Sequence, residues 1–375
     1  MRPVFSLRSR NVLVLFALGS ALASNVAQAD LHALSDGRAR VGERSWADRA
    51  HPERREARLL LRQGVAFFAS SFHSDPLGPS REVRIDQALS RLQAARVAMP
   101  QDVEVALYTA FVHAAFEQEQ RGGQIARRSE EARVEFLRAR ALDPDFEPVA
   151  VAWHLAQVQT RLGHYADAER EYRLVLSLMR LPAAPIMAPS HREEVLYGLF
   201  ATPEEALVRV NLGEVLMLDQ RLVASIAEYE AASALAARGT LTYALARLGL
   251  ALALERSLDD ARALLVMRDA LASWTPPANR PDLVRLIRTH GPLAVLHHPS
   301  VAFEPACELH AYVALVHRAL AAEANEEDRV THAREVRIAL RTFLAAGGNA
   351  SPYAAIAEQR LQALEAERPA TSAGP

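Results

Sequence analysis

The sequence predicts an all-α protein, an α-solenoid of helix-turn-helix repeats that is closed by a helical C-terminal cap. Beyond residue 53, almost every segment is rich in alanine, leucine, arginine and glutamate, which favour helices. The alternation of apolar and polar residues that is typical of strands is absent. In addition, one pattern of small and large apolar residues recurs every 36 to 57 residues, as expected for repeats that stack on one another.

The N-terminal residues 1–29 have the three parts of a secretory signal peptide in the expected order. These parts are a basic start with Arg2, Arg8 and Arg10, the apolar run Val12 to Ala23, and Ala27-Gln28-Ala29 as a cleavage site. The apolar run is too short to span a bilayer, although an uncleaved anchor is the alternative. We expect export to the periplasm of a Gram-negative bacterium, with secretion as the alternative, and a flexible segment at residues 30–52.

All 43 basic residues are arginine, because the chain contains no lysine. This excludes Schiff-base enzymes, pyridoxal phosphate enzymes and nucleotide sites that depend on a phosphate-binding lysine. Loss of the three arginines of the signal peptide changes the formal net charge from −2 to −5. Such a chain has no bulk attraction for nucleic acid or anionic membranes, so we expect no nucleic-acid partner and no membrane insertion after signal cleavage.

The recurring pattern is an alanine, a large apolar residue four positions later, a small residue three positions further on, and then a proline after five more. Two segments fit it fully: Ala88, Leu92, Ala95 and Pro100, and then Ala132, Phe136, Ala139 and Pro144. Three segments fit it in part: Ala168, Tyr172 and Val175; Ser225, Tyr229 and Ala232; and Ala261 with Leu265. Each of these helices follows another helix in which a large apolar residue precedes a small one, as in Leu212-Gly213 and Leu248-Gly249. The small residue allows two helices of a hairpin to approach closely.

Residues 149–182 resemble a tetratricopeptide (TPR) repeat, because the positions that the family reserves for such residues hold Leu155, Ala156, Gly163, Tyr165, Ala168 and Tyr172. The resemblance implies an irregular TPR-like solenoid of about five units over residues 53–273. The units are expected at 59–99, 103–142, 149–178, 204–236 and 240–273. Between the third and fourth units, residues 181–203 contain four prolines and are expected to form a surface loop or a functional flap.

The last third of the chain differs from the repeats. Six prolines between Pro276 and Pro305 predict a proline-rich connector over residues 274–305 without a long helix. Helices are expected again at 306–323, 326–346 and 351–367, as a repeat-like pair and a cap within residues 306–368. The tail, residues 369–375, is expected to be disordered.

In the TPR family, the first helix of each pair lines a concave groove that binds a partner. The resemblance therefore implies groove positions on three units, and the candidate partner-binding residues are Trp153, Gln157, Arg161, Asn211, Glu214, Met217, Tyr243 and Arg247. Aromatic side chains would anchor a partner and arginines would pair with its acidic groups. Packing between repeats is the alternative role for each residue. Asn211 resembles an asparagine that grips a peptide carboxylate in some members, but the accompanying lysines are missing, so we expect no carboxylate clamp.

A cluster of possible metal ligands lies within residues 290–317, and the weak candidates are His297, Cys307 and His310. The spacing matches no zinc signature and no HExxH motif occurs. The favoured interpretation is that Cys307 is a buried small apolar residue and that the histidines are interface or loop residues. We therefore expect no cofactor and no metal.

No catalytic motif emerges, since GxSxG is absent and the carboxylate pairs lie at helix starts or in loops. The sequence predicts a non-enzymatic scaffold or adaptor for unidentified envelope proteins, and the chain is similar to exported repeat proteins of GC-rich bacteria such as myxobacteria. The alternative is a metal- or small-molecule-responsive periplasmic binding protein that uses the histidine and cysteine cluster.

Overall fold

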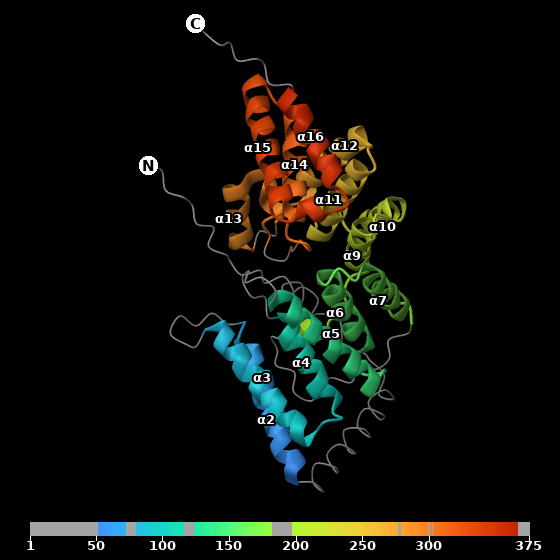
Figure 1. Ribbon diagram of the computed structural model, residues 1–375, viewed down its shortest axis with the longest axis vertical. Coiled ribbons are helices and arrows are strands. Elements are labelled where there is room, and N and C mark those ends of the chain that lie inside the picture. Colours follow the sequence, from blue (N-terminus) through green and yellow to red (C-terminus); the bar gives the residue numbers. More distant parts are fainter. Residues whose placement is uncertain are drawn as a thin grey trace. The chain divides into compact units, whose positions relative to one another are not determined.

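The computed structural model describes residues 52–72, 80–115, 124–181, 197–276, 279–298, 301 and 303–366. The expected signal peptide, nearly all of segment 30–52 and the tail 369–375 lie outside these residues. The described residues form helices and turns without a β-strand, as the sequence predicts. The chain divides between Thr202 and Pro203 into two compact units (Figure 1).

The N-terminal unit contains three helical hairpins, each made of two consecutive helices that pack side by side. These hairpins are α2 (Pro52–Ser70) with α3 (Arg81–Ala98), α4 (Val103–Ala115) with α5 (Gln124–Leu142), and α6 (Pro148–Arg161) with α7 (Tyr165–Leu178). The hairpins follow one another through contacts of α3 with α4 and of α5 with α6. A short helix, α8 (Tyr197–Phe200), packs against α6.

The C-terminal unit repeats this arrangement. Its hairpins are α9 (Glu205–Leu218) with α10 (Leu222–Leu235), α11 (Leu241–Arg256) with α12 (Asp260–Ser273), and α14 (Glu308–Ala321) with α15 (Glu326–Ala345). The remaining elements are α13 (Pro281–His290), the 3-10 helices η2 (Gly291–Val295) and η3 (Gly348–Ala350), and the last helix α16 (Ala354–Ala366). Stacked helix-turn-helix hairpins in both units confirm the predicted all-α solenoid class.

The recurring sequence pattern marks the residues that hold each hairpin together. The alanines and aromatic or leucine residues of α3, α5, α7 and α10 that fit the pattern are all at most 1% exposed. The buried stripe of each second helix therefore consists of one large side chain with a smaller side chain before it and another after it in the sequence. Burying a large apolar side chain contributes roughly 1.5–3 kcal/mol, so this stripe is a main source of stability for each hairpin.

The fifth unit follows the pattern in a different register from the predicted one. Ala261 and Leu265 are exposed, whereas Ala263, Met267 and Ala270 are buried at the same offsets of four and three. The prediction was wrong by two residues, because the apolar sequence around Leu264 and Leu265 offers two registers. Only packing against α11 decides which of them faces inward.

Glycines allow close approach at the junction of α9, α10 and α11. Tyr229 of α10 lies with its ring against Gly213 of α9 and Gly249 of α11, where an added Cβ would stand 3.1 Å and 2.2 Å from ring atoms. Gly213 and Gly249, which follow a leucine in the predicted pattern, must therefore be glycine because the Tyr229 ring occupies the space of a side chain.

The predicted connector contains more structure than its prolines suggested. The ten-residue helix α13 begins at Pro281, where the missing N–H of proline costs nothing. The side chains of Leu283, Ala294, Val295 and Leu296 are buried, so this segment is part of the packed C-terminal unit. The three helices expected after residue 306 are present as α14, α15 and α16, with ends that differ from the prediction by at most three residues.

Candidate functional site

The candidate groove residues of the N-terminal unit lie on α6. Trp153 is only 8% exposed and packs edge-to-face on Tyr172 of α7, with ring centroids 5.7 Å apart. The Nη1 of Arg161 donates to the carbonyl oxygen of Ala114, near the end of α4, at 2.9 Å. A cation at a helix C-terminus interacts favourably with the helix dipole. Trp153 and Arg161 thus stabilise helix packing, and Gln157 stays half-buried on the same helix.

The inner side of α4 and α6 holds an aromatic cluster that the sequence analysis missed. Phe200, from the described end of the predicted loop 181–203, packs edge-to-face on Phe111 and Tyr108, with ring centroids 5.3 Å and 6.0 Å apart. The neighbouring carbonyl oxygen of Leu199 lies 3.0 Å from the Nε2 of His154. A segment that follows the hairpins in sequence therefore contacts two successive first helices, α4 through the Phe200 ring and α6 through the Leu199 carbonyl.

His154 is enclosed in this cluster and stays neutral at physiological pH. Its ring stacks on Phe136 and lies edge-on to Phe111. Burial lowers the pKa of His154 to about 4, which outweighs the opposing effect of the Leu199 carbonyl. Because a neutral imidazole is both donor and acceptor, this histidine can hold the Leu199 backbone without carrying a charge.

The candidate residues on α9 have three different environments. Asn211 is half-buried, and its Nδ2 donates to the Leu207 carbonyl oxygen at 2.8 Å. Met217 is 1% exposed, and its backbone carbonyl accepts a hydrogen bond from the Tyr353 hydroxyl. Glu214 is partly exposed, yet burial of its carboxylate and then repulsion from Glu308 raise its pKa to about 8.

Tyr243 and Arg247 of α11 meet on one carboxylate of α12. The Tyr243 hydroxyl donates to Oδ2 of Asp269 at 3.1 Å, and the Nε of Arg247 donates to the same atom at 2.9 Å. The two predicted groove residues therefore lie together, but both donate hydrogen bonds to an acidic residue of the hairpin to which they belong. Both side chains remain half-buried.

A buried ion pair lies near Glu214, and its only signal in the sequence is the charged end of an apolar helix. Arg256, the last residue of α11, pairs with Glu308, the first residue of α14, and both side chains are at most 3% exposed. The guanidinium carbon of Arg256 lies 4.0 Å from the centre of the Tyr353 ring. Tyr353 therefore contacts two first helices of the C-terminal unit, α9 through the Met217 carbonyl and α11 through Arg256, whose ion pair leads on to α14.

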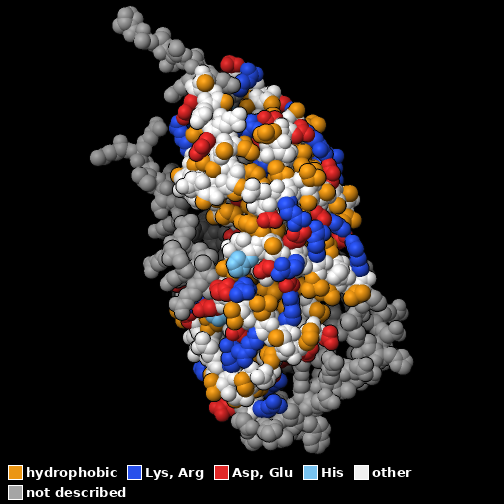
Figure 2. All heavy atoms as spheres, turned by 45° about the vertical axis from the view of Figure 1, so that its right-hand side comes forward, with side chains coloured by type: hydrophobic (Ala, Val, Ile, Leu, Met, Phe, Trp, Pro, Cys, Tyr) orange, Lys and Arg blue, Asp and Glu red, His pale blue; other side chains and the backbone are white. Residues whose placement is uncertain are grey.

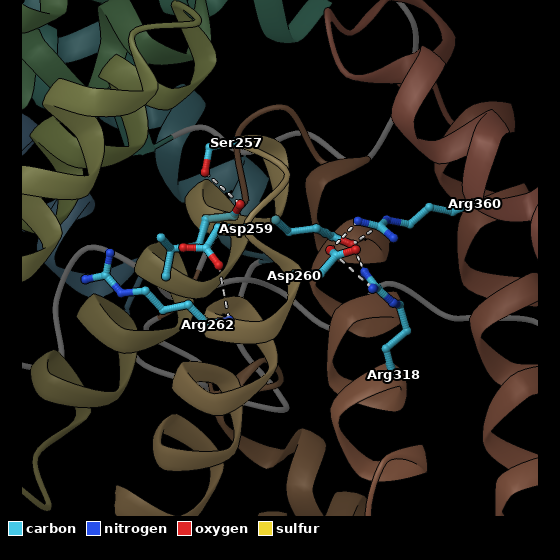
Figure 3. A network of polar contacts seen from close by, with 8 residues as sticks. Ser257, Asp259, Asp260, Arg262, Arg318 and Arg360 are labelled. Carbon is cyan, nitrogen blue, oxygen red and sulfur yellow. Dashed lines mark hydrogen bonds and ion pairs between the residues drawn. The ribbon is translucent and has the colours of Figure 1, made fainter.

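A second polar network lies at the turn between α11 and α12. Arg318 of α14 and Arg360 of α16 both point at the carboxylate of Asp260, which is the first residue of α12 (Figure 3). Both arginines also pair with Glu255, the Nε of Arg360 at 3.2 Å. Asp259 caps α12 by accepting from the backbone N–H of Arg262. Through this network, α14 and α16 contact both the end of α11 and the start of α12.

The histidine and cysteine cluster of residues 290–317 is dispersed in the structure. His290 and His297 stack on each other with ring centroids 4.1 Å apart, and His298 packs edge-on to Trp274. Cys307 is buried in an apolar cluster with Val336 and Phe343, and burial raises the pKa of its thiol. Within the described ranges, no three histidine, cysteine or acidic side chains are grouped so that they could hold a metal ion.

The outer surface is mixed in character. On the face drawn in Figure 2, arginine and acidic side chains lie next to one another with apolar side chains scattered among them. Charge of one sign does not dominate this face. None of the helices in the described part of the chain is long and apolar enough to cross a membrane.

Of the comparisons with known proteins, the one with solved structures found similar chains. No protein-family model matches the chain, and no curated protein matches it either. Among solved structures, the crystal structure of the P58(IPK) TPR domain is similar over 84% of this chain and 100% of that one, at 14% sequence identity and a TM-score of 0.25. The helix-turn-helix architecture rests on the packing of the chain's own hairpins.

Proposed function

We propose that this chain is a non-enzymatic scaffold that binds segments of other proteins on the first helices of its hairpins. One observation carries the proposal: in each unit, first helices hold an aromatic side chain from a segment outside their hairpins. Phe200 lies against α4, and Tyr353 lies against α9 and α11. Helices that bind such segments of their own chain through ring contacts and backbone acceptors offer the same groups to a segment of another protein.

We further propose that the scaffold acts in a bacterial cell envelope. The basic, apolar and small-residue parts of residues 1–29 support export to the periplasm. The single cysteine suits this location, because the fold depends on its apolar core and needs no disulfide. Cell fractionation of the tagged chain is expected to place it in the periplasmic fraction, with an N-terminus at Asp30. A full-length cytoplasmic protein would contradict the proposal.

The scaffold function is tested by purifying the full-length chain after crosslinking in cells. We expect one or a few envelope proteins to be recovered in constant proportion. Asn211→Arg places a long charged side chain on the partly exposed face of α9 and should reduce this recovery at least about fivefold, since a buried unpaired charge is costly at an interface.

Val223→Arg is the matched control, because Val223 lies on the neighbouring helix α10 with 85% of its side chain exposed. This variant should recover the partner as well as the unmodified chain does. If both variants recover as much partner as the unmodified chain does, the first helices of the C-terminal unit are excluded as the binding surface. Loss in both would show that α10 also contributes.

A further inference from the structure

The last helix, α16, is attached to the C-terminal unit by few residues. Of residues 351–366, only Tyr353 and Ala357 are buried, and Ala357 packs with the partly buried Leu361 and Leu364 on the apolar cluster of α14 and α15. The pair between Arg341 of α15 and Glu365 is exposed on both sides, and exposed pairs contribute little. A helix with so few buried contacts opens at a lower free energy than the core helices do.

The first attachment point is Tyr353, which combines three interactions. Its hydroxyl donates to the Met217 carbonyl oxygen at the end of α9, and its ring covers the guanidinium of Arg256. Beneath it, the ion pair of Arg256 with Glu308 leaves Nη1 of the arginine and Oε1 of the glutamate without a hydrogen-bond partner, although both residues are at most 5% exposed. Buried polar atoms of this kind are normally satisfied, so the pocket has donor and acceptor capacity to spare.

The second attachment point is Arg360, which lies within α16, seven residues after Tyr353 at the turn that precedes the helix. Arg360 shares two carboxylates, Asp260 and Glu255, with Arg318 (Figure 3). If Arg360 leaves, one arginine remains for two acidic groups. The surface beneath α16 thus has a backbone acceptor and a guanidinium that bind an aromatic ring at one end, and an excess of negative charge at the other.

The connection to α15 contains two glycines. Gly348 is buried against Phe343, whereas Gly347 has φ of 110°, a conformation that favours glycine, and nothing stands within 4 Å of where its Cβ would be. Movement about this pair would carry α16 away while leaving the α14 and α15 hairpin intact.

We propose that the surface beneath α16, formed by Met217, Glu255, Arg256, Asp260 and Glu308, is a binding site for a helical segment of a partner protein. The segment carries a tyrosine and, seven residues later, an arginine, and α16 competes with it for the site. This inference rests on the proposed function, because it names the chemistry of one segment that the scaffold takes. Until the partner arrives, α16 covers the acidic groups and the buried ion pair.

The test uses the full-length chain and a fluorescein-labelled peptide with the sequence of residues 350–366. In the full-length variant Tyr353→Ala/Arg360→Ala, α16 keeps its apolar contacts with α14 and α15 but loses its polar contacts with α9, α11 and α12, which raises the fraction of molecules in which the site is open to the peptide. Fluorescence anisotropy should give a dissociation constant at least about tenfold lower for this variant than for the unmodified chain, because a covered site weakens apparent affinity in proportion to the open fraction.

Two controls separate specific competition from other effects. The full-length variant Gln359→Ala/Gln362→Ala alters exposed positions of the same helix and should bind the peptide as weakly as the unmodified chain. A peptide with Tyr353→Ala and Arg360→Gln should bind the open variant at least about tenfold more weakly than the original peptide. Equal affinity of the open variant and the unmodified chain, or of the two peptides, would overturn the proposal.

Hydrogen exchange on the unmodified chain gives a result that needs no substitution. Backbone amides of α16 should exchange at least about tenfold faster than those of α15 in the segment from Val336 to Phe343. The side chains of both of these end residues are buried. Equal protection of both helices would show that α16 does not detach. Peptide binding without any recovered partner would show that the site can exchange helical segments, but it would remove the proposed function and with it the partner that this inference names. A recovered partner without peptide binding would overturn this inference alone.

Discussion

The ring of Tyr229 occupies the space that a side chain at Gly249 would need, since a Cβ there would stand 2.2 Å from Cε1 of the tyrosine. Gly249→Ala therefore forces α10 and α11 apart or moves a ring that is 1% exposed. Overpacking of a core costs about 1–3 kcal/mol, and we expect a loss of unfolding free energy at the upper end of that range. Chemical denaturation measures it. Val223→Ala on α10 is the control and should change stability by no more than about 0.5 kcal/mol.

The register of α12 is tested by two neighbouring truncations. Met267→Ala removes a side chain that is 0% exposed and should cost about 2–5 kcal/mol of unfolding free energy. Leu265→Ala removes one that is 61% exposed and should cost less than about 0.5 kcal/mol. If Leu265→Ala were the more damaging change, the helix would face inward as the sequence pattern first suggested.

The buried pair of Arg256 and Glu308 is expected to show strong coupling. Removal of one partner, as in Arg256→Met, leaves an unpaired buried carboxylate and should cost about 3–5 kcal/mol. The double variant Arg256→Met/Glu308→Leu removes both charges and should be more stable than either single variant. A double-mutant cycle by urea denaturation measures the coupling, and strictly additive effects would mean that the two side chains do not interact.

Glu214 makes the stability of the C-terminal unit depend on pH. Its folded pKa of about 8 lies above the usual value, so the folded state keeps a proton that the unfolded state has already released. Stability from this group is full below about pH 4.5 and is lost as the pH rises to 8. In Glu214→Gln this loss should disappear, which makes the decline in melting temperature between pH 5 and pH 8 smaller than in the unmodified chain. An unchanged decline would rule out the raised pKa.

His154 gives the opposite dependence in the N-terminal unit. Its folded pKa of about 4 lies below the ordinary 6.5, so the unfolded state binds a proton first as the pH falls. Stability falls between pH 6.5 and pH 4, by at most about 1.4 kcal/mol for each pH unit. His154→Gln should remove this part of the acid sensitivity, measured by denaturation at pH 7 and pH 5. The exposed His164→Gln serves as control and should keep the full sensitivity.

Part of the candidate site could be predicted from the sequence and part could not. Tyr243 and Arg247 do lie together, because they are one helical turn apart on α11. Trp153 and Met217 lie on the expected helices but are buried, since Trp153 packs on Tyr172 and Met217 belongs to the apolar core of the C-terminal unit. The dispersal of the histidine and cysteine cluster also depends on which helix each residue packs against.

The sequence by itself determined the hairpins, because each depends on apolar periodicity within one helix and on small residues that face the next helix. Ala88 with Leu92 and Ala132 with Phe136 are buried as the pattern predicts. Only the tertiary structure decided what covers the first helices. Tyr353 reaches Met217 across 136 residues and Arg360 reaches Asp260 across 100. Such contacts leave no periodic signal in the sequence, because each is a single meeting of two distant segments that depends on how the hairpins between them stack.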